Sequence, residues 1–367
     1  MGFFIMFIVI DSSIFSALES DTLQHSLDAQ SFIAELCVAR QKGYVSVIIK
    51  KSVAVKIKNN IHLSTRGKAI FGHIAEEVTF QLKLDDITSF NVVFFHSGYS
   101  HGINVGDNPY VVDIDGYSTS NVNISKPKLV LEDLSDDYIY KAIARWGLSK
   151  LGVPPNFHLS YEPVHGGGDR LPDVCISEMG KGSFVFSICD SDKKHPSDKI
   201  GNTARKTRNL FNVRKMPDSF YMMEANEVEN LIPHNHLIAK AKKEQTDAIN
   251  FLVSAAMYSQ DSCLFYDLKN GFKYNNVYLS ESPMAKYWRE IYESYHGTAD
   301  FIKKVNCGEV SEDSVIFNKL SSMLPHVMED VCEANISSVS PVAVETMWLL
   351  IAKKMTDWFV ASKPIVA

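Results

Sequence analysis

The sequence has little of several features that would narrow its class at once. Its six cysteines are scattered and form no Cys-x-x-Cys pair, which excludes the usual zinc-finger spacing and a disulfide framework and favours the reducing cytoplasm. Acidic residues outnumber Lys and Arg by 43 to 37, for a net charge of −6, so the chain as a whole is not a basic nucleic-acid binder. It has no Gly-x-x-x-x-Gly-Lys-Ser/Thr phosphate loop, so any ATP hydrolysis must come from a separate protein.

The apolar run at residues 1–10 is short for a membrane segment. A spanning helix needs about 20 apolar residues, and a signal peptide would open with positive charge and close on a small-residue cleavage site. We therefore expect a buried first strand and no membrane contact. With 46% hydrophobic and 22% charged residues over 367 positions, the chain has the composition of a globular protein of two or three domains.

Hydrophobic patterning divides the chain into three regions. Residues 1–124 alternate short apolar runs with helical stretches, which predicts an α/β N-terminal domain. Residues 125–240 alternate strand and helix again, which predicts a central parallel sheet flanked by helices. Residues 241–367 are mainly helical, and a stripe at three- and four-residue spacing near the end predicts a packed helix through Val344, Trp348, Ile351, Met355 and Phe359.

Acidic residues follow three of the strands predicted in the second region, at 128–132, 183–189 and 219–223. Because the carboxyl ends of parallel strands meet at one edge of a sheet, we expect these side chains to converge. Converging carboxylates repel one another unless a cation neutralises them, and hard divalent cations select oxygen ligands. The strand-end acids are Glu132, Asp190, Asp192 and Glu224, with Glu227 and Glu229 just behind.

The pair Asp190-Ser-Asp192 is the most suggestive part of this pattern. In an extended segment alternate side chains point to one side, so both carboxylates could hold one metal while Ser191 faces away. A pair of Mg²⁺ or Mn²⁺ ions at such an edge could activate water and cleave a phosphodiester bond. Glu132 could also act as a general acid or base.

Each piece also has a simpler interpretation. Asp-x-Asp after a strand is commonly a turn, and Asp136 and Asp137 suit the first turn of a helix, where the helix dipole favours acids. Glu227 and Glu229 could be solvated, and the glycines at 166–168 could form only a loop. What favours a functional site over these simpler interpretations is the order in which the pieces occur: strand–Glu, strand–Gly-rich turn, strand–Asp-x-Asp and strand–Glu.

That ordered combination resembles the TOPRIM domain, the metal-binding catalytic domain of topoisomerases, primases and OLD-family nucleases. Glu132 matches the family's strand-end acid and Asp136 its later acid, although Asp133 stands where Gly is usual. Asp190-Ser-Asp192 matches the second motif, and the following Lys193-Lys194 is typical of the OLD-like branch. The segment Glu227-Val-Glu-Asn-Leu-Ile-Pro233 is similar to a later acidic segment of that branch, so the resemblance spans residues 126–233.

The resemblance implies a metal-dependent endonuclease that cleaves DNA or RNA, including tRNA, such as the toxic effectors of anti-phage abortive infection. It implies a separate ATPase or regulatory protein as partner. The alternative is a non-catalytic TOPRIM-like sensor or subunit of a larger defence complex, which Asp133 and the missing ATPase motivate. The implied catalytic residues are Glu132, Asp190 and Asp192, and the implied ligands of Mg²⁺ or Mn²⁺ are Glu132, Asp136, Asp190, Asp192, Glu224, Glu227 and Glu229.

A local basic excess follows the Asp-x-Asp pair. Between residues 193 and 215 Asp198 is the one acid among many Lys and Arg, which favours phosphate contact, although a charge run is usually a solvated helix face. Aromatic residues are sparse there, so base stacking is not expected. Lys269 could reach the site, but its Asp-Leu-Lys-Asn-Gly setting favours a turn residue. The candidate nucleic-acid-binding residues are Lys193, Lys194, Arg205, Lys206 and Arg208.

The opening residues 7–11 resemble the first strand of PIN-like nucleases, which ends on an acid as this one does on Asp11. The family's next acid would follow the second strand, where this chain has Lys50-Lys51. We therefore expect a PIN-like or other α/β module without activity of its own, or one that contacts a partner. Further acids that could serve are Glu35, Asp85 and Asp86.

Overall fold

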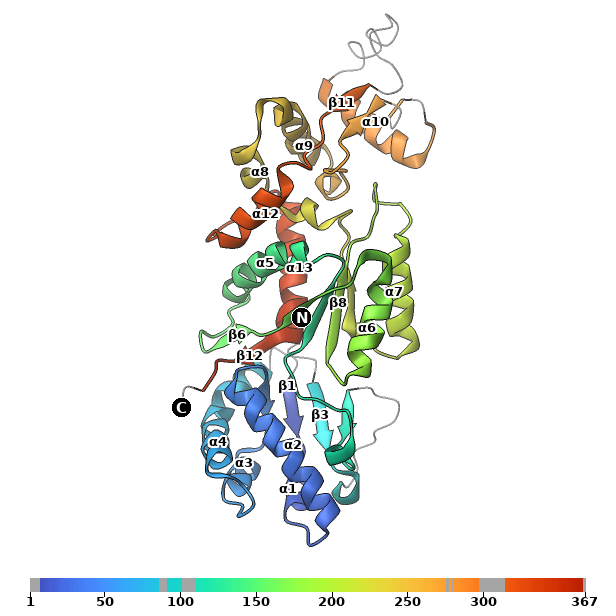
Figure 1. The fold of residues 1–367 in the computed structure, drawn as a ribbon. Coiled ribbons are helices and arrows are strands. Elements are labelled where there is room, and N and C mark those ends of the chain that lie inside the picture. Colours follow the sequence, from blue (N-terminus) through green and yellow to red (C-terminus); the bar gives the residue numbers. More distant parts are fainter. Residues whose placement is uncertain are drawn as a thin grey trace, which may run out of the picture.

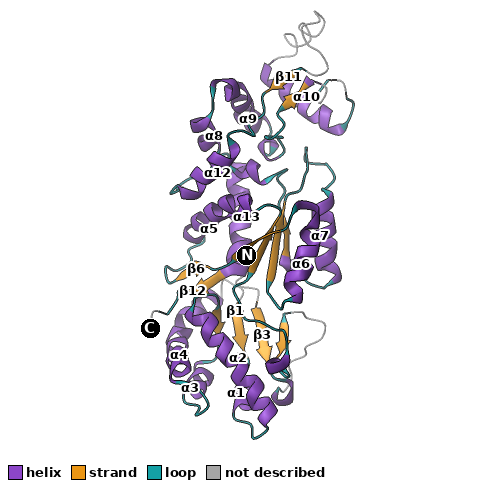
Figure 2. Cartoon of the chain, in the orientation of Figure 1, coloured by secondary structure: helices purple, strands orange, loops and turns teal. Residues whose placement is uncertain are grey.

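The protein is α/β, and its described residues contain two four-stranded parallel sheets (Figures 1 and 2). The structure is a computed structural model that defines residues 7–85, 91–100, 110–274, 277–278, 280–296 and 314–365. No helix among these residues combines the length and apolar character needed to cross a membrane.

The first sheet has the strand order β2-β1-β3-β4, and its strands are β1 Phe7–Ile10, β2 Ser46–Ile48, β3 Asn91–Phe95 and β4 Val111–Asp113. Strand β1 pairs in parallel with both neighbours, so the carboxyl ends lie at one edge. Helices pack around this sheet and on one another: α1 Ser12–Leu18, α2 Leu23–Gln41, α3 Lys51–Lys58 and α4 Thr65–Asp85.

The second sheet has the order β7-β5-β8-β9, and its strands are β5 Lys128–Leu131, β7 Glu162–His165, β8 Val185–Cys189 and β9 Phe220–Met222. Every residue of β8 is buried, as expected for an apolar central strand covered on both faces. Figure 1 shows α6 and α7 on one face and α5 and α13 on the other. These helices are α5 Asp137–Lys150, α6 Leu171–Gly180, α7 Asn202–Val213 and α13 Val342–Phe359.

The strand predicted at 157–164 is in fact two strands in two sheets. Strand β6, Phe157–Leu159, pairs antiparallel with β12, Val360–Ser362, whereas β7 begins at Glu162. The backbone changes partner within three residues: the Ser160 amide donates to the Phe359 carbonyl at 2.7 Å and the Glu162 amide donates to Pro127 at 2.8 Å. Period and composition alone cannot reveal this switch, because both partners are distant in sequence.

The third region is mainly helical in its described part. A short antiparallel pair joins β10, Phe272–Lys273, to β11, Val315–Phe317. The predicted apolar stripe on α13 is confirmed, since all five of its residues are buried. The remaining α-helices among the described residues are α8 His234–Lys240, α9 Thr246–Tyr258, α10 Pro283–His296 and α12 Leu324–Glu333.

Short 3₁₀ helices connect these elements. Two of them carry acids of interest: η3, Leu134–Asp136, follows β5, and η6, Val228–Leu231, follows β9. The others are η1 Ser97–Tyr99, η2 Tyr117–Thr119, η4 Gly168–Arg170, η5 Pro217–Ser219, η7 Lys243–Gln245 and η8 Ser262–Leu264.

Trp348 ties α13 to α5 and to η6. Its ring is fully buried, meets Trp146 edge-on with ring centroids 5.6 Å apart, and donates from Nε1 to the Leu231 carbonyl at 2.7 Å. We expect Trp348→Ala to lower the free energy of unfolding by about 3–5 kcal/mol, the usual cost of deleting a buried Trp. Urea unfolding measures this loss.

The matched control is Leu350→Ala on the same helix, because Leu350 is 46% exposed. It should cost about 0.5 kcal/mol or less. Equal losses in the two variants would show that Trp348 does not hold α13 in place.

Candidate functional site

The carboxyl ends of β5 and β8 bring two of the predicted acids together. Glu132 directly follows β5 and Asp190 directly follows β8, and these strands are neighbours in the sheet. The backbone N–H of Asp190 donates to the Glu132 carboxylate. The oxygen Glu132 Oε1 is buried and has no hydrogen-bond partner among the described residues. Such an oxygen is a ready ligand for a cation.

The glycine run after β7 fixes the backbone of Glu132. The Gly166 amide donates to the Leu131 carbonyl at 2.6 Å, and the Gly167 amide donates to the Glu132 carbonyl at 3.1 Å. A Cβ on Gly166 would lie 2.6 Å from the Leu131 oxygen, so no larger residue fits without displacing the strand end. The run is therefore more than a connecting loop, because it holds the first acid of the site.

Asp192 is not extended, contrary to the geometry assumed for the Asp-x-Asp pair. Its φ is +57°, in the left-handed region, because the chain turns away from the sheet at this residue. Ser191 is buried, and its hydroxyl donates to the Ala225 carbonyl at 2.7 Å. A Cβ on Gly201 would lie 1.8 Å from Asp192 Oδ2, so the backbone of Gly201 makes room for this carboxylate.

Asp136 lies in η3 and is 9% exposed. One of its oxygens accepts from the Asp133 amide at 3.1 Å, and Asp133 in turn accepts from the Ser135 amide at 2.8 Å. Asp133 has φ −130° and ψ 148°, a conformation open to any residue, so the turn does not need the family's Gly. Asp137 points elsewhere and binds Lys141, with 2.7 Å between Asp137 Oδ2 and Lys141 Nζ.

Lys269 supplies the positive charge at this edge. Its Nζ lies 3.0 Å from Glu229 Oε1 and 3.6 Å from Glu227 Oε1. The second oxygens of both glutamates are buried without a hydrogen-bond partner among the described residues. Sequence analysis named this role for Lys269 but favoured a turn role, because the contact joins segments about 40 residues apart. Glu224 is exposed instead and pairs with Lys193 at 2.6 Å.

Burial and mutual repulsion disfavour the charged forms of these acids. Burial first, and then the charge of Asp192, raises the pKa of Glu132 to about 7. Burial, followed by the charges of Asp136 and Glu132, raises the pKa of Asp190 well above its usual range. Once one of these two neighbouring carboxyls is ionised, ionising the other is therefore unfavourable.

The acids around Lys269 behave in the same way. Burial and then Glu229 raise the pKa of Asp136 to about 7 despite the hydrogen bond from Asp133, and burial raises the pKa of Glu227 to about 7 even beside the ammonium. Burial lowers the pKa of Lys269, but Glu229 and Glu227 outweigh it, so this pKa is raised. One ammonium does not neutralise the whole group.

The chemistry of the donor set fits Mg²⁺ or Mn²⁺, because the free donors are buried carboxylate oxygens. The acids are not drawn tightly together: in the described part of the chain, no three of them place oxygens within 4.8 Å of one another. Mg²⁺ usually keeps several waters and binds through one or two carboxylates. The spacing of these acids is compatible with an ion bound by one or two carboxylates and several waters.

The candidate nucleic-acid-binding residues divide into two groups. Lys193 and Lys194 form ion pairs, the latter with Asp267 at 3.1 Å. The outer face of α7 is solvent-exposed and basic, and its inner face packs Ala204 and Phe211 against the sheet. The exposed cations of this face are Arg205, Lys206 and Arg208.

The acids considered in the first region have structural partners or lie outside the described residues. Asp11 caps α1 by accepting from the Ser13 amide at 2.8 Å, and Glu35 accepts from the Tyr117 hydroxyl at 2.6 Å. The side chain of Asp85 and all of Asp86 lie outside the described residues.

Comparison with known proteins adds no assignment. No protein-family model matches the chain, and no curated protein or solved structure matches it either. The residues and their geometry are therefore the basis on which a function is assigned.

The raised carboxyl pKa values predict how stability depends on pH. Glu132, Asp136 and Glu227 bind protons more tightly when folded, so the metal-free protein should lose stability as pH rises from the ordinary carboxyl range towards 7. A divalent cation offsets this loss, so Mg²⁺ should raise Tm more at about pH 8 than at about pH 5. Scanning calorimetry measures both shifts.

The control for this prediction is Glu132→Gln, which cannot ionise and should reduce the pH dependence of the Mg²⁺ effect. An equal Tm shift by Mg²⁺ at both pH values would mean that these carboxyls do not hold the cation.

Proposed function

We propose that the protein is a metal-dependent nuclease of the TOPRIM type that cleaves phosphodiester bonds in DNA or RNA. The observation that carries the proposal is the pair Glu132 and Asp190 at adjacent parallel strand ends, with a buried free oxygen and raised pKa values. The resemblance to OLD-like TOPRIM nucleases supports it. Under this proposal the protein acts in the cytoplasm as a toxic effector of anti-phage defence, controlled by a separate ATPase or regulatory protein.

The residues have distinct roles in this proposal. Glu132, Asp190 and Asp192 are the core ligands, of which one or two bind the cation directly and the rest through its bound waters. Asp136, Glu227 and Glu229 are further partners for those waters. Bound Mg²⁺ or Mn²⁺ would supply a Lewis acid for the phosphate and a more acidic water. Glu132, whose pKa is about 7, suits proton transfer near neutral pH. Lys269, held by Glu229 at 3.0 Å, adds positive charge at this edge of the sheet.

The basic face of α7 suits the substrate. Arg205, Lys206 and Arg208 are exposed on the helix that follows the loop from Asp192. A phosphate backbone gains affinity from such cations without sequence selection. The net negative charge of the chain therefore does not argue against a polyanionic substrate.

A second candidate is a non-catalytic sensor or subunit of a larger complex. The observation that favours it is the position of Lys269, whose ammonium already neutralises part of the acidic group at Glu229 and Glu227. A protein that never binds metal would use Lys269 in this way permanently. An inhibited nuclease awaiting release by a partner would use it temporarily.

Cleavage of plasmid DNA and total RNA, tested side by side with Mg²⁺ or Mn²⁺, examines the proposal directly. Asp190→Asn removes a charged ligand and should slow cleavage by about 100-fold or more. Glu162→Gln is the matched control, since Glu162 lies at the opposite, amino end of β7 and is 55% exposed. It should cleave as the natural protein does.

Equal cleavage by the natural protein and Asp190→Asn would refute the assignment of these residues. Metal binding without cleavage of either nucleic acid, in the presence of the activating partner as well, would favour the sensor.

The contribution of α7 is tested by salt dependence. With metal omitted to prevent cleavage, the double variant Arg205→Ala/Arg208→Ala should bind nucleic acid more weakly. The slope of log affinity against log salt should become shallower by about 1 for each phosphate that the variant no longer neutralises. Fluorescence anisotropy measures both quantities. Lys51→Ala, an exposed Lys on α3, is the control. An equal effect there would mean that α7 is not the substrate surface.

A further inference from the structure

The carboxyl edge of the first sheet carries a second group of metal-ligand side chains. His96 directly follows β3, and Asp115 lies two residues beyond the end of β4. Because β3 and β4 are parallel neighbours, both residues lie at the same edge. Helix α2 adds His25 from its first turn. The three residues come from separate segments of the chain, so local sequence patterns give no hint that they meet.

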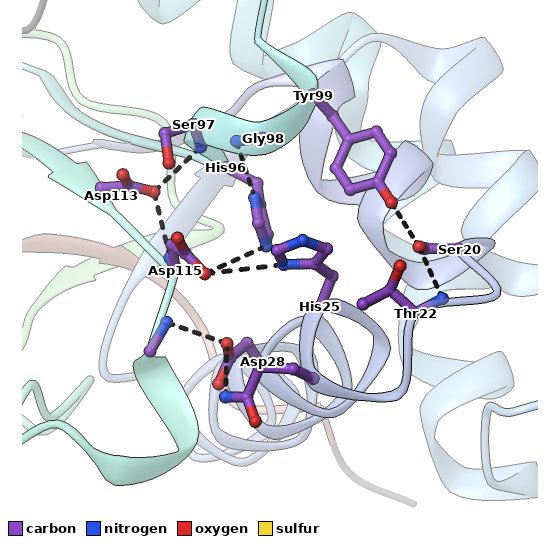
Figure 3. A network of polar contacts seen from close by, with 12 residues as sticks. Ser20, Thr22, His25, Asp28, His96, Ser97, Gly98, Tyr99, Asp113 and Asp115 are labelled. Carbon is purple, nitrogen blue, oxygen red and sulfur yellow. Dashed lines mark hydrogen bonds and ion pairs between the residues drawn. The ribbon is translucent and has the colours of Figure 1, made fainter.

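The three side chains face one another closely (Figure 3). His25 Nδ1 lies 3.6 Å and His96 Nε2 lies 3.9 Å from the same oxygen, Asp115 Oδ1. The three ligand atoms are all within 4.8 Å of one another. The two distances to Asp115 Oδ1 exceed those of hydrogen bonds, but they suit atoms that share a metal ion at about 2.0–2.2 Å each.

The two imidazole nitrogens that face Asp115 make no hydrogen bond among the described residues. His96 is 0% exposed, and its Nε2 is buried with no hydrogen-bond partner among the described residues. His25 Nδ1 is buried and unpartnered in the same sense. Buried polar atoms are normally paired, so two imidazole nitrogens aimed at one carboxylate without bonding it indicate a ligand.

Surrounding hydrogen bonds hold these side chains in place. Asp28, one turn after His25, is 0% exposed and accepts from the Gly116 amide at 2.8 Å and the Ser118 hydroxyl at 2.6 Å. It thus joins α2 to the segment that carries Asp115. Asp113 accepts from the amides of Ser97 and Asp115, each at 3.0 Å, and joins the turns after β3 and β4. Outer contacts of this kind orient metal ligands in known sites.

We propose that His25, His96 and Asp115 bind a first-row transition-metal ion, with Zn²⁺ as the representative. Two imidazoles and one carboxylate select such ions over Mg²⁺, which prefers oxygen. Three protein ligands leave a coordination position open, as in catalytic rather than purely structural zinc sites. The first region would then hold a reactive metal centre of its own.

Metal binding requires one rearrangement at His96. Its Nδ1 accepts from the Gly98 amide at 3.2 Å, so the metal-free imidazole carries its proton on Nε2. When the metal binds Nε2, that proton is replaced and Nδ1 takes up a proton instead, which leaves the imidazole neutral. The Gly98 amide must then turn away from Nδ1.

This site is separate from the acids of the second sheet. Phe7, at the start of β1, packs against Phe157 and Val360 of the second and third regions. The carboxyl edge of the first sheet therefore points away from that contact, as the arrows of β1 and β3 show in Figure 1. Metal binding at His25, His96 and Asp115 does not depend on the proposed nuclease activity.

Calorimetric titration of the metal-stripped, full-length protein with Zn²⁺ tests the proposal, with X-ray absorption to identify the ligands. We expect an equivalent of Zn²⁺ with imidazole ligands that persists in Glu132→Gln. His25→Asn and Asp115→Asn should each weaken its binding by about tenfold or more. His326→Asn is the matched control, because His326 is 81% exposed and also neighbours an acid, with 3.9 Å between His326 Nδ1 and Glu329 Oε2.

Unchanged Zn²⁺ affinity in His25→Asn and Asp115→Asn would overturn the proposal, as would an absorption spectrum with oxygen ligands alone. Loss of the Zn²⁺ site in Glu132→Gln would assign it to the second sheet and overturn the proposal as well. His96→Asn is not needed for the decision, because His25 and Asp115 are partly exposed and their variants should fold.

Discussion

Repulsion between the carboxylates at the ends of β5 and β8 is the constraint that governs the chemistry at this edge of the second sheet. Glu132 and Asp190 are joined by a backbone hydrogen bond and share an edge with further acids, so they cannot all ionise without a cation nearby. The chain delivers an ammonium from its third region, where Lys269 reaches Glu229 at 3.0 Å. The cation that completes this balance is, in our proposal, Mg²⁺ or Mn²⁺. Packing also positions the acid that Lys269 contacts, since Trp348 holds α13 against η6, which carries Glu229.

The same topological rule operates twice in the chain with different chemistry. Each parallel sheet collects the residues that follow its strands at one edge. In the second sheet these residues are carboxylates, which suit hard divalent cations. In the first sheet His96 joins Asp115 and His25 of α2, a mixed set that suits transition metals. The order of strands places both groups, and in our proposals the residue types at the strand ends set which ion each group would select.

Local patterns predicted much of the second sheet, because a continuous apolar run followed by an acid, as in β8 and Asp190, is written in adjacent residues. The α/β class and the packed stripe of α13 follow from periodicity in the same way. Features that depend on distant partners could not be predicted. The strand switch at Ser160 requires the Phe359 carbonyl, and Lys269 enters the site by a long-range contact. In the sequence His96 is an ordinary residue after a strand, and only the fold brings His25 to it.

The measurement that tests the central claim most directly is anomalous diffraction from crystals grown with Mn²⁺. The account predicts a manganese peak within bonding distance of carboxylate oxygens of Glu132 and Asp190. Crystals of Asp190→Asn should lack that peak. If saturating Mn²⁺ gives no peak at these strand ends, and Lys269 is still the cation beside Glu229, the acidic edge is not a divalent-cation site.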